Sequence, residues 1–324
     1  MRRRDFIGLT LLGGAAASWP LAARAQQIRV ARIDALYIGL AAAESFKKEL
    51  REGLREVGYV EGQNIAFEFR SAEGQLDRLP GLAAELVRLK VDVIVALYVP
   101  CALAAKQATR DIPIVIIAAD PLETGIVSSL ARPDGNITGV SLMSAESTAK
   151  NIELFHDMLP SVKRVGVLVN AANPVYAEAM LDKVSLAGGT TGIEVWPVVR
   201  VREPDELETA FTTFVRERVG ALVVQGDLAI KPVADKAIEY RLPAGSTTRA
   251  FVNVGGLMSF GADGPSSVRH GTKFVQRILQ GGHPKDIPIE QPTKFELVVN
   301  LKAAKAIGLT IPDTFLLRAD SVLE

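Results

Sequence analysis

Three of the five tyrosines in this chain, Tyr37, Tyr98 and Tyr176, lie in or beside loops that follow predicted β-strands. Ligands of open α/β sheets bind beyond the carboxyl ends of the strands, so a binding site is expected in these loops. A flat ligand stacked against such rings gains about 0.5–1.5 kcal/mol per aromatic pair beyond simple burial. The alternative is that these tyrosines belong to ordinary surface loops.

A predicted buried strand runs directly into a predicted helix at residues 98–102. The first N–H groups of a helix have no intrahelical partner, and the helix dipole favours negative charge at this end. The helix start is formed by Tyr98, Val99, Pro100, Cys101 and Ala102. We predict that it receives the carboxylate of a ligand.

Four acidic or amide side chains also follow predicted strands, namely Asp120, Asn170, Asn173 and Asp227. A carboxylate in a closing cleft is a good partner for an ammonium group, and the asparagines can both donate and accept hydrogen bonds. Together they suit the backbone groups of an amino acid. The alternative for each residue is a turn former or a helix cap. We choose Asp227 as the partner of a ligand ammonium group.

The sequence gives little support for catalysis, a metal or a nucleotide cofactor. Cys101 could act as a nucleophile, but it needs a base, and His156, His270 and His283 lie on or beside helical patterns. With no second cysteine and no His-x-x-x-His spacing, no metal is expected. No Gly-x-Gly-x-x-Gly motif follows a predicted strand, so we expect no cofactor. A Cys101-dependent hydrolase is the alternative from another functional class.

Short apolar runs alternate with helical patterns along most of the chain, as in βαβ units with parallel sheets. Residues 91–97 and 112–118 are near-continuous apolar runs, which are typical of strands buried on both faces. The pattern is repeated with predicted strands at residues 165–169, 194–198 and 221–224. The predicted fold class is α/β, with two doubly wound parallel-sheet lobes and a ligand cleft between them.

The chain is too long after the second round of strands to end there, so we expect it to cross between the lobes three times. Crossings are expected near residues 137–142, 252–256 and 289–292. The resulting boundaries are residues 26–141 plus 257–290 for the first lobe and residues 142–256 plus 291–324 for the second. Ser141, at the first crossing, is a further candidate ligand contact.

Residues 1–25 resemble a cleavable export signal. They combine the pair Arg3-Arg4, a short apolar run and the sequence ARA before Gln26. The apolar run is shorter than the roughly 20 residues that a spanning helix needs, which favours cleavage before Gln26. The arginine pair and the residues after it are similar to the twin-arginine export signature. We therefore expect a periplasmic protein without stable membrane insertion.

The charge balance argues against a nucleic-acid partner. Without residues 1–25 the chain has 33 basic and 36 acidic residues, because four arginines and one aspartate are removed from 37 of each. The sequence has no basic stripe for phosphate contacts and no later run that could span a bilayer. The single cysteine excludes an intramolecular disulfide.

Five longer segments resemble the ABC-transporter substrate-binding proteins of the tryptophan/tyrosine type. They are GLREVGYVEGQN at residues 53–64, DRLP at 77–80, ARPDGNITG at 131–139, GGLMSFG at 255–261 and QPTKFELVVN at 291–300. Segments of this length are far more specific than a short motif. The resemblance implies a type I periplasmic-binding-protein fold, a small-molecule ligand between two lobes, and a membrane permease and a cytoplasmic ATPase as partners.

Some positions depart from the family pattern. The first predicted strand contains Arg32 and Asp34, Cys101 stands where a small residue is common, Leu228 stands where some members have asparagine, and residues 244–250 also differ. We predict a periplasmic receptor that closes on a small carboxylate-bearing ligand, either an aromatic or branched amino acid or a related aromatic acid. A sensory receptor of the same fold, which signals to a membrane kinase, is the other alternative.

Overall fold

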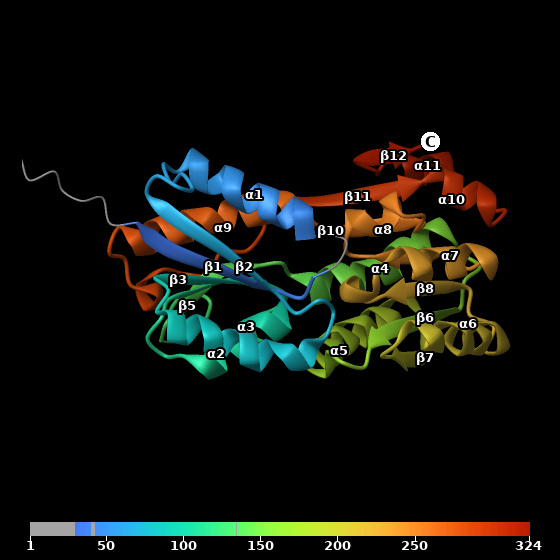
Figure 1. Cartoon of the computed structure of the whole chain (residues 1–324). Coiled ribbons are helices and arrows are strands. Elements are labelled where there is room, and N and C mark those ends of the chain that lie inside the picture. The colour runs from blue at the N-terminus through green and yellow to red at the C-terminus, as the bar shows by residue number, and fades with distance from the viewer. Residues whose placement is uncertain (1–29, 40–42, 134) are drawn as a thin grey trace, which may run out of the picture.

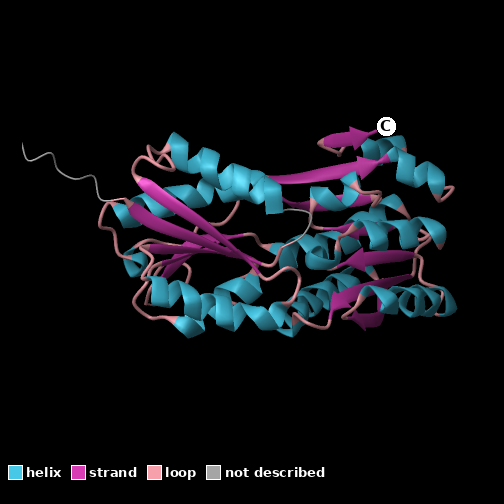
Figure 2. Ribbon diagram, viewed as in Figure 1, coloured by secondary structure: helices cyan, strands magenta, loops and turns pink. Residues whose placement is uncertain are grey.

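The computed structural model describes residues 30–39, 43–133 and 135–324. The predicted export signal lies outside these described residues. The described chain forms two α/β lobes, which lie side by side in Figure 1. Each lobe is built around one largely parallel sheet, and helices flank the strands of both (Figure 2). The predicted fold class is confirmed.

The first lobe contains a five-stranded parallel sheet with the order β2-β1-β3-β4-β5. Its strands are β1 (Ala31–Tyr37), β2 (Ile65–Ser71), β3 (Val93–Leu97), β4 (Ile114–Ala118) and β5 (Ile137–Ser141). β3 and β4 are buried along their whole length, as expected for apolar strands covered on both faces. The covering helices are α1 (Ala43–Glu56) with α9 (Gly264–Leu279) on one face, and α2 (Leu79–Leu89) with α3 (Val99–Ala108) on the other.

The second lobe contains a seven-stranded sheet with the order β12-β11-β10-β9-β8-β6-β7. Its strands are β6 (Arg164–Asn170), β7 (Glu194–Val201), β8 (Ala221–Val224), β9 (Ala244–Ser246), β10 (Met258–Ala262), β11 (Phe295–Asn300) and β12 (Ser321–Leu323). Only the β10–β11 pair is antiparallel among the paired strands of the described chain. The helices of this lobe are α4 (Ser144–Met158), α5 (Pro174–Thr191), α6 (Leu207–Arg216), α7 (Lys231–Glu239), α8 (Arg249–Asn253), α10 (Leu301–Ala306) and α11 (Asp313–Leu316).

β10 belongs to the second lobe, so the prediction that residues 257–290 all lie in the first lobe is wrong at its start. One edge of β10 pairs in parallel with β9, and the other pairs antiparallel with β11. The chain returns to the first lobe only after Ala262, where α9 begins and packs on α1. The sequence of β10 does not indicate which sheet the strand joins, because strand pairing depends on contacts with distant parts of the chain.

Three segments join the lobes. The chain leaves the first lobe after Ser141, returns after Ala262, and leaves again after Glu290. Glu290 forms an isolated parallel bridge with Val140, and the Ser141 N–H donates to the Glu290 carbonyl at 2.9 Å. The first and third segments are therefore held together beside β5.

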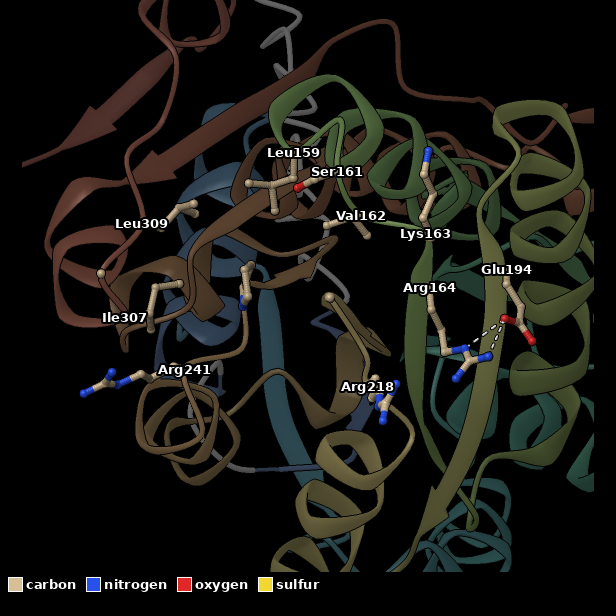
Figure 3. A pocket seen from close by; sticks show the side chains of 13 residues that line it. Leu159, Ser161, Val162, Lys163, Arg164, Glu194, Arg218, Arg241, Ile307 and Leu309 are labelled. Carbon is tan, nitrogen blue, oxygen red and sulfur yellow. Dashed lines mark hydrogen bonds and ion pairs between the residues drawn. The ribbon is translucent and has the colours of Figure 1, made fainter.

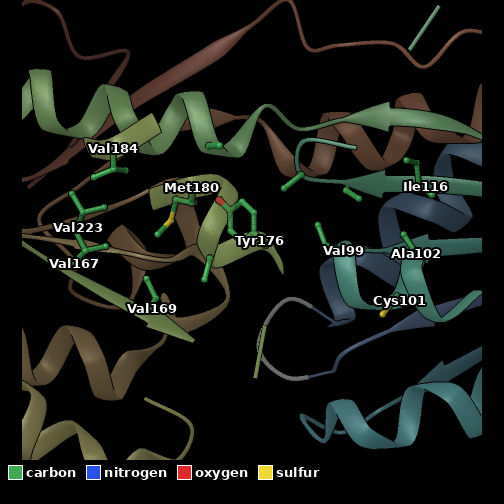
Figure 4. Packing of buried hydrophobic residues seen from close by; sticks show 14 of the residues in the cluster. Val99, Cys101, Ala102, Ile116, Val167, Val169, Tyr176, Met180, Val184 and Val223 are labelled. Atoms are coloured by element: carbon green, nitrogen blue, oxygen red, sulfur yellow. The ribbon is translucent and has the colours of Figure 1, made fainter. Parts of the chain in front are cut away.

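Apolar side chains from both lobes form one continuous buried cluster. Val99 and Ile116 of the first lobe belong to the same cluster as Val169, Tyr176 and Met180 of the second (Figure 4). Burial of apolar surface contributes about 25 cal/mol per Å² to stability. The lobes therefore share apolar contacts in addition to the three connecting segments.

Gly139 lies within β5 with a φ of 139°, and a Cβ at this position would come 2.1 Å from the carbonyl oxygen of Ile116 on β4. The backbone of β4 cannot move aside without disturbing the pairing of the two strands. We expect Gly139→Ala to lower the free energy of unfolding by roughly 3 kcal/mol or more, measured by urea denaturation.

Gly125→Ala is the matched control, because Gly125 also has a positive φ, 69°, but has open space where the Cβ would lie. This change should cost only about 1–2 kcal/mol, the backbone term alone. Equal losses for the two variants would contradict the steric explanation.

Candidate ligand-binding site

A cavity of about 430 Å³ lies between the lobes, at the carboxyl ends of strands from both sheets. Its walls include residues that follow β1, β3, β4 and β5 in the first lobe and β8, β9 and β10 in the second. The apolar and aromatic lining consists mainly of Ile38, Phe46, Leu97, Val99, Ile117, Leu142 and Val268. The volume is within the range of small-molecule sites, about 300–1,000 Å³.

Four of the predicted contacts line this cavity, namely Tyr98 of the first lobe and Asn173, Tyr176 and Asp227 of the second. Tyr98 has φ 72° and ψ 161°, a region of backbone space that is almost restricted to glycine. Its N–H donates to the Ile117 carbonyl at 2.9 Å, which helps to hold this conformation. Strain of this kind costs of order 1–3 kcal/mol and is concentrated at functional sites.

The Asp227 carboxylate is held by two amides and has one unused oxygen. Its Oδ2 accepts hydrogen bonds from the side-chain amides of Asn170 at 3.1 Å and Asn173 at 3.2 Å. Its Oδ1 is buried and has no hydrogen-bond partner among the described residues. Burial raises the pKa of Asp227, whereas interactions with Asn173, Asn170, its own backbone N–H and the Gln225 side chain oppose this rise. Asn170 does not line the cavity itself, but it positions the carboxylate that does.

The two tyrosines of the cavity come from opposite lobes. Burial raises the pKa of Tyr98 to about 12, and the charge of Asp227, which lines the same cavity from the second lobe, adds to this rise. The Tyr176 hydroxyl is buried without a hydrogen-bond partner in the described chain, and burial raises its pKa as well. Both hydroxyls therefore stay protonated at neutral pH and can donate to a ligand.

Tyr37 does not line the cavity, although it ends a strand at the correct edge of the sheet. Its ring packs against Phe46 and Phe69, with centroid distances of 5.8 Å and 6.4 Å, and the residue is 5% exposed. Side chains alternate along β1, and Tyr37 lies on the face that α1 covers. It supports the wall formed by Phe46 from behind.

Only the first residues of the predicted helix start reach the cavity. Tyr98 and Val99 line it, whereas Pro100, Cys101 and Ala102 do not. Cys101 and Ala102 are fully buried in the apolar cluster on the other side of α3 (Figure 4). Burial raises the pKa of the Cys101 thiol far above its usual range, so it is a poor nucleophile.

Asp120 and Ser141 lie at the first crossing and do not line the cavity. Asp120 is buried, and its Oδ2 accepts the N–H of Ala145 at 2.8 Å. The Ser141 hydroxyl accepts the N–H of Met143 at 3.3 Å. Both side chains therefore order the junction between the lobes.

Several polar residues of the cavity were not predicted. They are Ser45 and Glu49 of α1, Ser144 and Ser147 of α4, Thr247 and Thr248 before α8, Arg249 and Asn253 of α8, and Ser259, Asp263 and Glu296 on or beside β10 and β11. Arg249 is ion-paired with Glu296, and Glu49 is ion-paired with Arg269. The departure of residues 244–250 from the family pattern was a signal for part of this group. Ser144 and Ser147 follow a crossing rather than a strand, so a search at strand ends could not find them.

A second cavity, of about 570 Å³, lies at the opposite end of the second sheet (Figure 3). It is lined at the amino ends of β6 to β9 by Lys163, Arg164, Arg218 and Arg241. Arg164 is ion-paired with Glu194 at 2.7 Å, and the Arg241 side chain points away from the other lining residues (Figure 3). Its cations do not converge on one point, so the cavity between the lobes is the candidate site.

The described residues contain no cluster of His, Cys, Asp and Glu that could hold a metal.

Two α/β lobes with a cavity at the carboxyl ends of both sheets define a bilobal binding protein. The chain matches the model of the ABC transporter substrate binding protein family over residues 37–323 and belongs to this family. A tyrosine-binding protein of Clostridioides difficile strain R20291 is 29% identical over 268 residues, which cover 81% of this chain and 76% of that protein. The predicted family is confirmed.

Solved structures also resemble this chain over most of its length. A conserved domain protein from Vibrio cholerae has a TM-score of 0.84 and 26% identity, and a Streptococcus pneumoniae ABC domain in complex with L-Trp has a TM-score of 0.84 and 25% identity. Each comparison covers 91% of this chain and 100% of the other. The fold is that of the type I periplasmic binding proteins, as predicted. Within the described residues, no helix is long and apolar enough to cross a membrane.

We expect the Cys101 thiol to resist modification by a thiol reagent such as DTNB in the folded protein, because it is fully buried and its pKa is raised. Unfolding in denaturant should make it react completely, as followed by absorbance. Cys101→Ala should keep ligand affinity within a few-fold. Rapid modification of the folded protein would show that the thiol is accessible.

Proposed function

We propose that the protein is a periplasmic receptor of an ABC importer and binds an amino acid with an aromatic side chain in the cavity between its lobes. The observation that carries this proposal is the unpaired Oδ1 of Asp227 in the wall of a largely apolar cavity. A buried carboxylate oxygen without a donor is costly, and a ligand ammonium group supplies the missing hydrogen bond and the opposite charge.

The carboxylate of the same ligand fits the start of α3. This helix has no side-chain cap in the described chain, and Pro100 at its second position has no N–H. The N–H of Val99 is therefore the first-turn donor beside the cavity, which Val99 lines. We place the carboxylate there, on the first lobe, and the ammonium group at Asp227, on the second.

The remaining walls suit an aromatic side chain. Tyr98 and Tyr176 flank the cavity from opposite lobes, and Phe46 adds a third ring. The tyrosine-binding relative and the solved complex with L-Trp support this ligand class. A branched amino acid or an aromatic acid would use the same walls with fewer polar contacts.

The family supports a membrane permease and a cytoplasmic ATPase as partners, and a site of action outside the cytoplasm. Because the proposed ligand touches both lobes, its binding favours a closed arrangement that a permease can distinguish from the open one. Two observations disfavour the hydrolase alternative. The Cys101 thiol is buried, and it does not face the cavity.

We expect purified protein, stripped of ligand and refolded, to bind L-tryptophan or L-tyrosine in isothermal titration calorimetry. Asp227→Asn should weaken this binding by roughly ten- to a hundredfold, because a charge-assisted hydrogen bond contributes about 1.5–3 kcal/mol. Asp235→Asn is the matched control, since Asp235 pairs with Lys231 on the exposed side of α7. It should leave the affinity unchanged.

The loss in Asp227→Asn should depend on the ligand amine. Indole-3-propionate, which lacks that amine, should bind the variant at least as well as it binds the wild type. Normal binding of the amino acid by the variant would remove Asp227 from the site. Mass spectrometry of molecules released from protein purified in its native state would then identify the ligand class directly.

Tyr98→Ala should weaken binding by about 1 kcal/mol or more, because a ring that contacts the ligand is lost. Tyr37→Ala is the informative comparison. Its ring contacts Phe46 and Phe69 rather than the cavity, so this change should lower the free energy of unfolding by about 3–5 kcal/mol, by analogy with buried phenylalanine. Calorimetry and urea denaturation separate the two effects. Unchanged affinity in Tyr98→Ala would contradict the proposed stacking.

A further inference from the structure

Two carboxyl groups from opposite lobes meet at the first crossing. Asp120 follows β4 of the first lobe, and Glu146 lies in the first turn of α4 of the second. Asp120 is 3% exposed and accepts the Ala145 N–H at 2.8 Å, so it forms a direct hydrogen bond between the lobes. Neither carboxyl group lines the cavity, and the binding site does not use them.

The two carboxyl groups are neighbours at the junction, because Asp120 accepts the N–H of Ala145, the residue directly before Glu146. Two ionised carboxylates have only acceptors, so a hydrogen bond between them needs a shared proton. Oε2 of Glu146 is buried and has no other hydrogen-bond donor in the described chain, so a proton on Asp120 can supply one. Like charges in such a pair cannot both ionise easily, as in other carboxyl dyads.

The charged neighbours of the Asp120–Glu146 pair stabilise one negative charge on it but not two. Lys183 of α5 pairs with Glu146 at 3.3 Å, whereas Glu123 adds a further negative charge from the loop after β4. Tyr176 of α5 is also near Asp120 and stays neutral. The N–H of Ala145 and the start of α4 favour a single negative charge. A second charge would have no cation of its own among these neighbours.

Burial raises the pKa of Asp120 to about 8, the contact with Glu146 adds to this rise, and the Ala145 N–H opposes it. Burial acts on Glu146 in the same direction, but its hydrogen bonds with Asp120 and Lys183 lower its pKa overall. The proton therefore belongs to Asp120 at neutral pH.

We propose that Asp120 and Glu146 form a proton-binding site at the junction of the lobes, which favours closure on the ligand while it is protonated and opposes closure after the proton is lost. Loss of the proton leaves two negative charges on opposite lobes, and their repulsion is relieved when the lobes separate. The part of this inference that concerns ligand affinity rests on the proposed function. The part that concerns the proton does not.

The proton is tested first, in protein without ligand. Carboxyl ¹³C NMR, with the resonance assigned from Asp120→Asn, should show Asp120 titrating at mildly alkaline pH. The free energy of unfolding should fall as pH rises from about 4 to 8, because the folded protein holds a proton that the unfolded chain has released. Asp120→Asn should remove this slope. An Asp120 that ionises in the ordinary acidic range would overturn the proposal.

Coupling to closure is tested with L-tryptophan as the probe. The affinity of the wild type should fall by about tenfold as the pH rises from about 6 to 8.5, the effect of a shift of one pKa unit between closed and open forms. Asp120→Asn keeps an acceptor for Ala145 and a donor for Glu146, so its affinity should stay near the low-pH value of the wild type. Titration of the probe's own amine affects both proteins equally.

Glu153→Gln is the matched control, because it removes a carboxylate of α4 that pairs with Lys150 and does not act on Asp120. It should keep the pH profile of the wild type. If the wild type and Asp120→Asn both bind the probe with the same pH profile, the coupling is overturned. If neither binds any amino acid at any pH, the proposed function fails instead, and the NMR titration and the unfolding slope still decide whether the proton site exists.

Discussion

An unpaired oxygen on a buried carboxylate is the strongest constraint on the cleft. Oδ2 of Asp227 is satisfied by two asparagine amides, whereas Oδ1 has no donor in the described chain. Leaving a charged group partly unsatisfied away from water is costly, so closure of the lobes over Asp227 is favourable only when a donor enters with the ligand. In the proposed function, the group that recognises the ligand is thus also the group that opposes closure without it.

The opposite side of the cleft carries complementary chemistry. The uncapped start of α3 offers N–H groups to a negative charge, and the strained backbone of Tyr98 lies directly before it. A ligand with both an ammonium group and a carboxylate would therefore bind one lobe through each charge. Such a ligand interacts fully only with the closed form, which is the differential affinity that a conformational change requires. The Asp120–Glu146 pair acts on the same closure from the side of the hinge.

The order of strands and helices could be predicted from the sequence, because continuous apolar runs such as β3 and β4 differ clearly from helical patterns. The sheet to which each strand belongs could not be predicted in this way. The short run of β10 does not indicate a lobe, and only hydrogen bonding to β9 and β11 places β10 in the second lobe. Strand pairing depends on contacts between distant parts of the chain, so the local sequence pattern does not predict it.

At the binding site, too, the sequence predicts where a residue lies in the fold but not where its side chain points. The end of a strand brings a residue to the edge of the cleft, but the alternation of side chains and the first turn of the next helix decide where it points. Tyr98 faces the cavity, whereas Tyr37 and Cys101 face the core behind it. Asp120 shows that a residue predicted for the ligand can order the hinge instead. The position of a residue at the end of a strand therefore predicts where it lies in the fold. Its role depends on the groups that its side chain contacts.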